Sequence, residues 1–261
     1  MKRKLLLTTS LIATLLQVSC GDIGDEPAFG TVDGDDTISA TGVPAVENFR
    51  IDLEEGYVMT VFDADDNIYS PGETNSLIIN AYDHNGAPVS NLTVNFAAEW
   101  GVLPEGTSCV TDTSGSCSVA WAISDPGTVP SDYCVRVVAY TTGEESYFES
   151  NGNNIFDDED TTHPGTPGKF VNGFIDIPDP FFDTDGDGTY TFGTDIPVPG
   201  FDSHTAADGL YNGSQTCTTT NFCSTTNTIT IWDDTFMDLK DESTSTTITP
   251  APDNECVGYP P

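Results

Sequence analysis

Short runs of alternating apolar and polar residues, separated by turn-forming residues, follow one another along the chain from Pro44 onward. In the run 92–96, Leu92, Val94 and Phe96 would share one face of a strand, because successive side chains of a strand point to opposite sides. The other runs predicted as strands are 58–62, 77–82, 108–111, 117–121, 133–140 and 228–232. No stretch after residue 20 sustains the helical period of about 3.6 residues. The pattern predicts an all-β fold of the β-sandwich type.

Three motifs lie among these runs. An Asp-x-Asn-Gly-x-Pro-Val turn begins at Asp83, Val-x-Phe follows at Val94, and Thr-Asp-x-x-Gly begins at Thr111. With these motifs the segment from Pro71 to Tyr140 resembles the bacterial Ig-like domain of the invasin/intimin (Big-1) group. The resemblance implies an Ig-like β-sandwich closed by the strand at 228–232. It also implies a stalk or recognition module on a cell surface, without catalysis. We expect His84, in the first motif, to be a solvated turn residue.

Roughly ninety residues separate Tyr140 from Thr228, and a connection of that length needs a function or internal structure of its own. It is dense in acids, Gly, Pro and Phe. We therefore expect an ordered, acidic, loop-rich insertion at about 144–227, within a sandwich that spans 44–240. Residues 241–261 are expected to be a polar tail.

The N-terminus has the pattern of an export signal. Met1-Lys-Arg-Lys4 precedes a largely apolar run to Val18, which is too short for a stable transmembrane helix. The segment 1–19 and the Cys20-Gly that follows resemble the signal and lipobox of bacterial lipoproteins. That resemblance implies acylation of Cys20 and an outer-membrane or cell-surface location. The alternative is an ordinary cleaved signal that leaves Cys20 as a free or paired thiol. The Gly- and Asp-rich residues 20–43 predict a flexible acidic tether.

The charge of the chain is strongly negative, with 42 acidic and 7 basic residues and a formal net charge of −35. Nucleic acid and anionic lipid headgroups are bound through cationic side chains, so both are excluded as partners. Contact with a membrane is therefore expected through the lipid anchor only. Because few bases are available to pair with the acids, divalent cations are the natural counter-charge. The alternative is an acidic surface that is simply solvated.

Two acidic stretches of the expected insertion have the spacing of calcium loops, in which oxygens at alternate positions converge on one ion. We call them loop one, which begins at Glu149, and loop two, which begins at Asp183. The predicted ligands of loop one are Glu149, Asn151, Asn153, Ile155 through its carbonyl, Asp157 and Asp160. Those of loop two are Asp183, Asp185, Asp187, Thr189 through its carbonyl, and Thr191. Ile155 is also expected to anchor loop one to an apolar core.

Neither loop has the full EF-hand pattern. Asp160 stands where an EF-hand has a bidentate Glu, and loop two has Thr194 there, with Asp195 next along. Prolines around loop two exclude flanking helices, at positions 178, 180, 197 and 199. The loops therefore resemble the EF-hand-like calcium loops of dockerins or thrombospondin repeats. We predict structural calcium, with solvated loops as the alternative; residues 63–67 are a third candidate.

The chain has seven cysteines, and six remain when Cys20 is set aside for acylation. In an exported protein these are expected to form disulfides. Cys109 and Cys117 lie symmetrically about Thr113 in a predicted hairpin, so they can face each other across it. The expected pairs are Cys109–Cys117, Cys217–Cys223 and, by elimination only, Cys134–Cys256.

No enzyme motif is present: the chain has no His-x-x-x-His, nucleophile elbow or phosphate loop. His163 and His204 lack the spacing of a zinc site. We expect no catalytic residue and no enzyme, but a calcium-braced structural or adhesion module with a protein or glycan ligand. The alternatives are a carbohydrate-binding module, with Trp100, Trp121 or Trp232 as a sugar platform, and an accessory subunit of a cell-envelope complex. Trp121 and Trp232 fit the core better, because both lie in strand patterns.

Overall fold

The computed structural model describes residues 40–54, 58–63, 68–69, 74–123, 134–162 and 170–241. The predicted signal peptide and almost all of the tether lie outside these residues, as do Cys20, His163, Cys256, nearly all of the polar tail and most of the third calcium candidate. Among the described residues, no helix is long and apolar enough to cross a membrane.

Each of the seven predicted runs is a strand of the sandwich, but its first and third strands were not predicted. The strands of the sandwich are β1 (Pro44–Leu53), β2 (Val58–Asp63), β3 (Ile68–Tyr69), β4 (Thr74–Asp83), β5 (Thr93–Ala98), β6 (Ser108–Val110), β7 (Ser116–Ala122), β8 (Cys134–Gly143) and β13 (Ile229–Asp241). The insertion between β8 and β13 holds shorter elements: β9 (Ile155–Phe156), the 3₁₀ helix η1 (Asp160–Thr162), β10 (Phe181–Phe182), β11 (Ile196–Pro197) and β12 (Thr216–Cys217).

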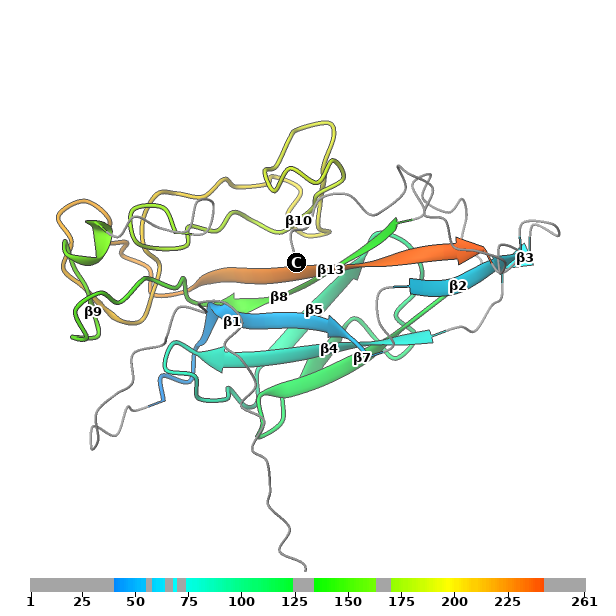
Figure 1. Cartoon of the computed structure of the whole chain (residues 1–261), viewed down its shortest axis with the longest axis horizontal. Coiled ribbons are helices and arrows are strands. Elements are labelled where there is room, and N and C mark those ends of the chain that lie inside the picture. The colour runs from blue at the N-terminus through cyan, green and yellow to red at the C-terminus, as the bar shows by residue number, and fades with distance from the viewer. Residues whose placement is uncertain are drawn as a thin grey trace, which may run out of the picture. The chain divides into compact units, whose positions relative to one another are not determined.

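Two sheets form the sandwich (Figure 1). One has the order β1-β4-β7, and the other has the order β3-β2-β13-β8-β5-β6. Neighbouring strands are antiparallel except β2 and β13, which run parallel. The chain therefore passes from the first sheet to the second between β1 and β2. The predicted all-β sandwich, with a long insertion before its last strand, is confirmed.

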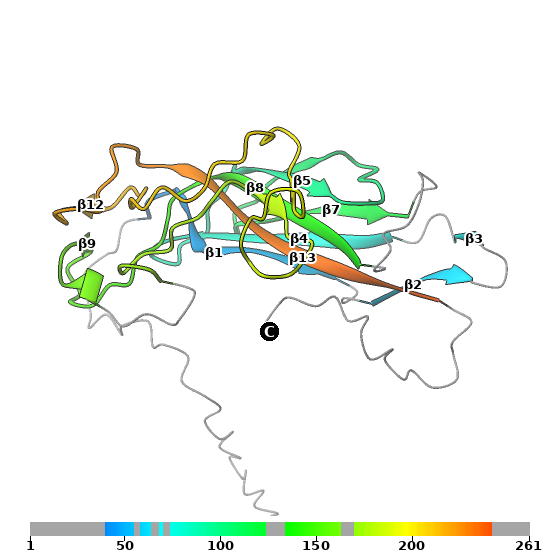
Figure 2. The same cartoon turned by 90° about the horizontal axis from the view of Figure 1, so that it is seen from above.

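The core lies between the two sheets and follows from strand alternation. In β4, Leu77, Ile79 and Ala81 are fully buried, while the residues between them are half-buried. β8 differs, because every residue from Cys134 to Ala139 is buried. Its Val138 points away from the core and packs against Phe182 and Val198 of the insertion. In both views the segment around β10 lies beside β8 and β13, so the insertion covers part of this sheet (Figures 1 and 2).

The last strand is much longer than predicted. It begins at Ile229, as expected, but continues to Asp241, pairing with β8 over its first ten residues and then with β2. The sequence hides this extension because Asp233 occupies a core-facing position between Ile231 and Thr235. One carboxylate oxygen of Asp233 accepts the N–H of Ile51 at 2.9 Å. Burial raises the pKa of Asp233 to about 6.

The disulfide between Cys109 and Cys117 is present, with a Cα–Cα distance of 5.9 Å, but it does not cross a hairpin. β6 pairs with β5, whereas β7 pairs with β4 in the other sheet. The bond therefore joins the two sheets, and the turn between the cysteines carries the chain from one sheet to the other. Gly115 has φ 78° there, and a Cβ would lie 2.5 Å from the carbonyl oxygen of Ala81.

The other cysteines also fit the expected pairs as far as the structure describes them. Cys217 and Cys223 are bonded, with a Cα–Cα distance of 5.6 Å. Cys134 is disulfide-bonded as well, and its predicted partner Cys256 lies outside the described residues. Disulfides persist in oxidising compartments, so these bonds indicate a non-cytoplasmic protein.

Candidate metal centre

Loop two begins directly after β10, and its geometry is set by the carboxylate of Asp183. Oδ1 accepts the N–H of Gly186 at 2.7 Å, and Oδ2 accepts the N–H of Gly188 at 2.8 Å. Both glycines have positive φ, 72° and 73°, which lets the backbone wrap around the carboxylate. Asp183 is only 2% exposed, so its charge is held inside the loop by these amides.

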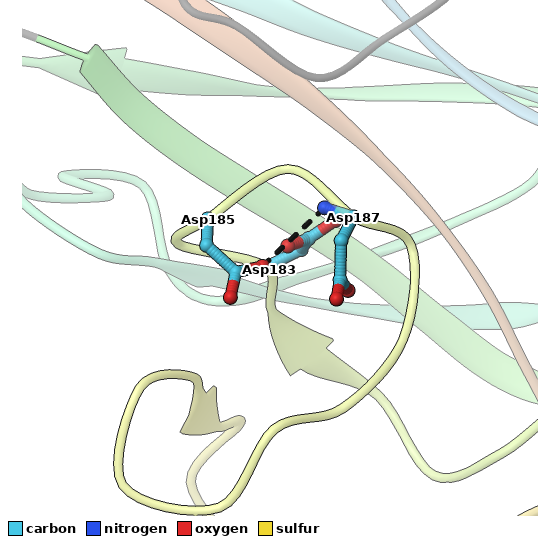
Figure 3. A group of neighbouring side chains, drawn as sticks. All are labelled: Asp183, Asp185 and Asp187. Carbon is cyan, nitrogen blue, oxygen red and sulfur yellow. Dashed lines mark hydrogen bonds between the residues drawn. The ribbon is translucent and has the colours of Figure 1, made fainter.

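Two further carboxylates come to the same point. Asp185 accepts the N–H of Asp187 at 3.3 Å, and Asp187 accepts the N–H of Thr189 at 2.7 Å. One oxygen from each of Asp183, Asp185 and Asp187 lies within 4.8 Å of the others. Figure 3 shows the three side chains extending from one turn of the loop, with Asp185 and Asp187 on either side of Asp183. Carboxylate oxygens in this number suit a hard divalent cation.

The closing residue of loop two is Asp195, which the predicted ligand set did not include. Its Oδ1 accepts the N–H of Thr184 at 2.8 Å, and its Oδ2 accepts the N–H of Thr191 at 2.6 Å. It is 5% exposed. The start and end of the loop are thus tied to one buried carboxylate. Asp195 could have been found in the sequence, because it directly follows Thr194. It was not included because an EF-hand places its last ligand at position 12, which is Thr194 in loop two.

Loop one has the same hydrogen-bond framework as loop two, although the two sequences differ. Glu149 accepts the N–H groups of positions 4 and 6, Gly152 at 2.8 Å and Asn154 at 2.7 Å, as Asp183 does. The residues at these positions again have positive φ, 76° and 55°. Asn151 accepts from Asn153, and Asn153 accepts from Ile155, which repeats the steps from position 3 to 5 and from 5 to 7.

The closing acid of loop one also has its counterpart in loop two. Asp160 is fully buried and accepts the N–H of Ser150 at 2.9 Å and that of Asp157 at 3.0 Å, which are positions 2 and 9. Asp195 accepts from the same two positions of loop two. The two loops are therefore structural repeats that differ by one residue before the closing acid.

The loops differ in charge at the centre. Positions 3 and 5 of loop one are Asn151 and Asn153, whose amide groups donate to Asp157 at 3.3 and 2.8 Å. The hydrogen bond from Asn153 is the main cause that lowers the pKa of Asp157. Within the described part of the chain, the three aspartates of loop two are the group of acids that converges closely enough to hold a metal. Glu149, Asp157 and Asp160 do not form such a group.

The electrostatics of loop two reflect its crowded acids. The pKa of the exposed Asp185 is raised, first by slight desolvation in the loop and then by the neighbouring charges of Asp187, Asp195 and Asp183. Mutual repulsion of this kind disfavours the ion-free, fully ionised loop, and a bound cation relieves it.

Aromatic side chains pack beside each loop. At loop two, Phe181 contacts Trp232 of β13, and the ring of Tyr190 stacks on His204 at 3.7 Å between centroids. Burial lowers the pKa of His204. At loop one, the buried anchor is Phe156, in contact with Tyr147, Phe174 and Tyr211, whereas Ile155 is only half-buried. The expectation that Ile155 provides this anchor is therefore wrong by one residue.

The expectation for His84 is corrected, and the alternative of a tryptophan platform is not supported. His84 is half-buried and stacks on Tyr147 of the insertion, with ring centroids 4.8 Å apart, so it is not a solvated turn residue. Trp100 and Trp121 are 7% and 0% exposed, and the Nε1 of Trp121 donates to the carbonyl of Trp100. Trp232 donates to the carbonyl of Pro178 under the insertion. None of these three indoles forms an exposed platform.

A buried acidic seam, which we define as Glu144 and Glu145 with the adjacent Ser146, was not predicted from the sequence. All three residues are at most 1% exposed. The Glu145 carboxylate accepts the N–H of Ile177 at 3.1 Å and that of Asn212 at 2.7 Å. Glu144 accepts the N–H of Ser214 at 2.7 Å. Since these partners are distant backbone amides, no local pattern could identify the seam.

Comparison of the chain with protein-family models, with curated proteins and with solved structures found no match. The function must therefore be inferred from the chain itself.

Proposed function

We propose that this chain is an exported surface lipoprotein with a Big-1-like Ig domain, acting as a structural or adhesion module whose insertion is braced by calcium. The observation that carries the calcium proposal is the repeated loop framework, together with the three carboxylates that converge in loop two. Asp183, Asp185 and Asp187 would hold the ion there. Calcium would supply counter-charge and hold the loop closed, without chemistry of its own.

The position of loop two explains what such a brace would do. The loop connects β10 to β11, and these two strands pair with each other. Phe182 of β10 and Val198, just after β11, both pack on Val138 of β8. A closed loop therefore keeps the cover of the sheet in place, and repulsion among the acids of an open loop would loosen it.

The affinity is expected to be that of an extracellular calcium module, with a Kd of ~10⁻⁴–10⁻³ M. At about ten times Kd, one site stabilises the folded state by ~1.4 kcal/mol. Thermal unfolding should therefore occur at higher temperature in millimolar calcium than in chelator. Equal unfolding temperatures under both conditions would contradict the brace.

Variants identify the loop responsible. The double change Asp185→Asn and Asp187→Asn should remove most of the calcium response, because it replaces two charged ligands with neutral ones. The matched control is Glu105→Gln, an exposed acid outside the insertion, which should leave the response intact.

Mass spectrometry of the mature N-terminus tests the lipid anchor: an acylated Cys20 supports it, and an unmodified N-terminus contradicts it.

A further inference from the structure

A groove on the outer face of the six-stranded sheet is distinct from loops one and two. It has a volume of about 380 Å³ and is bordered by β5, β8, β13 and the insertion. Ligand sites for small molecules usually occupy about 300–1,000 Å³, so the groove is large enough for one or two sugar rings. It is lined by Leu92, Thr93, Asn95, Tyr140, Thr142 and Phe201, with Thr141 and Thr230 beside them.

The strand register places uncharged side chains over the part of this face that lines the groove, whereas Arg136 and Asp234 lie further along the same face. Asn95 lies opposite Tyr140, which lies opposite Trp232, and Thr142 lies opposite Thr230. Residues directly opposite in a ladder share a face, so these side chains point the same way. On the next strand, Ser108 and Val110 of β6 lie opposite Asn95 and Thr93. In a chain with a net charge of −35, a sheet face without a charged residue at these positions is a distinctive feature.

The polar groups of the groove are available to a ligand. Among the residues that the structure describes, the side chains of Thr93, Asn95, Thr142 and Thr230 form no hydrogen bond. Three hydroxyls and one carboxamide both donate and accept, which matches the hydroxyl groups of a sugar and offers no ion pair to a charged ligand. Thr141 differs, because its hydroxyl already donates to the carbonyl of Thr93.

An aromatic wall completes the groove. Phe201 of the insertion meets Tyr140 edge to face, with ring centroids 5.4 Å apart. Both side chains are half-buried, so each leaves part of its ring open. The C–H face of a pyranose ring can bury its apolar surface against such rings while its hydroxyls reach the threonines and Asn95.

We propose that this groove binds a neutral saccharide. Hydrogen-bonding groups without charge, together with two partly open aromatic rings, favour a polyhydroxylated ligand over an ionic one. The surrounding acids would repel anionic glycans. This inference relies on the proposed surface role for its biological setting, but its chemistry needs neither the lipid anchor nor calcium at the groove.

The insertion controls the aromatic wall. The N–H of Phe201 donates to the carbonyl of Val198 at 2.9 Å, and the buried Val198 follows β11 directly. The turn that positions Phe201 therefore begins where the β10–β11 pair of loop two ends. Binding of a saccharide should accordingly be stronger when loop two is closed.

The test uses the full chain, purified with its disulfides formed, on an array of neutral oligosaccharides of the β-1,4-glucan, chitin, α-1,4-glucan and mannan types. Sulfated and uronate oligosaccharides are the anionic probes. We expect at least one neutral series to bind and the anionic probes to bind at least ~10-fold more weakly. The proposal is overturned if no neutral probe binds, or if anionic probes bind as strongly as neutral ones. Either outcome leaves the proposed structural or adhesion role untouched.

Variants then locate the site by titration calorimetry with the best neutral probe. Asn95→Ala and Thr142→Ala should each weaken binding by about tenfold, and Phe201→Leu should weaken it further. Asn80→Ala is the matched control, because Asn80 lies on β4 in the other sheet. Unchanged affinity in all groove variants with unchanged unfolding temperatures rules out the groove. If Asp185→Asn with Asp187→Asn abolishes the calcium response but not binding, the groove stands and only its coupling to loop two is wrong.

Discussion

Glu145, just after β8, links two distant segments of the insertion to its start. Its carboxylate accepts backbone amides from two segments of the insertion, and its own N–H donates to the carbonyl of Asn212. The pKa of Glu145 is raised to about 7, mainly by burial and less strongly by the charges of Asp176 and Asp208, against the opposing hydrogen bonds from Asn212 and Ile177. Glu144 and Asp176 are also shifted upward, again mainly by burial.

This shift predicts how stability depends on pH. Between pH ~4.5 and ~7 the folded state holds a proton on Glu145 that the unfolded chain has released, so the free energy of unfolding falls as pH rises through this range. A shift of this size corresponds to up to ~3 kcal/mol. Urea unfolding at pH 5 and pH 7.5 should therefore show greater stability at pH 5.

The variant Glu145→Gln isolates this residue from the other acids. It loses one of the two amide bonds, so it should be less stable than the parent, but its stability should depend less steeply on pH. Glu105→Gln is the control that keeps the parent slope, because Glu105 is exposed. If Glu145→Gln and the parent have the same slope, the pKa of Glu145 is not raised in the folded state.

At the scale of the element, the sequence was informative where a strand has one buried face. Burial alternates in β5 as predicted, because Thr93 and Asn95 on its outer side are polar. It alternates in β4 as well, although Ile78 on the outer side is apolar. β13 was truncated in the prediction because Asp233 interrupts its apolar face. The separation of β6 and β7 into different sheets could not be predicted, because a short connection between two strands is compatible with a hairpin or with a crossing between sheets.

The loops show the same limit. Their first halves were identified from the spacing of Asp183, Asp185 and Asp187, since each hydrogen bond there spans only two to five residues. Their closure by Asp160 and Asp195 depends on contacts across ten or eleven residues. The spacing therefore predicts two loops of one kind, but not that they share a hydrogen-bond framework as far as the closing acid.

The closing acid of loop two can be tested directly. Asp195→Ala removes the acceptor of two backbone amides and leaves them without this partner, which should cost roughly 2–4 kcal/mol. Because the damage is local, hydrogen exchange of the amides of Thr184 and Thr191 should accelerate more than that of β4. Asp202→Ala, at an exposed aspartate, should change either quantity little. If the amide of Thr184 is equally protected from hydrogen exchange in both variants, Asp195 does not close loop two.

At the scale of the whole sandwich, the disulfide Cys109–Cys117 has a role that its position in the sequence conceals. It joins β6 at the edge of one sheet to β7 at the edge of the other. The core between these sheets includes Val94 and Val119. Val94 lies on β5, the neighbour of β6, and Val119 lies on β7, the strand that contains Cys117. The bond therefore limits the separation of the two sheets at this edge.

Replacing both cysteines by serine should lower the free energy of unfolding by about 2–3 kcal/mol, the chain-entropy value for a loop of this length. The effect should appear in the cooperative unfolding of the sandwich, because both sheets lose a link. The matched comparison is Cys217→Ser with Cys223→Ser, a disulfide of similar span that lies within the insertion. The double variant Cys217→Ser with Cys223→Ser should mainly increase the hydrogen-exchange rate of amides around Phe156 and Tyr211 and leave that of β4 unchanged. If the two double variants destabilise β4 equally, the insertion and the sandwich unfold as one unit, and the sheet-to-sheet role of Cys109–Cys117 is not distinct.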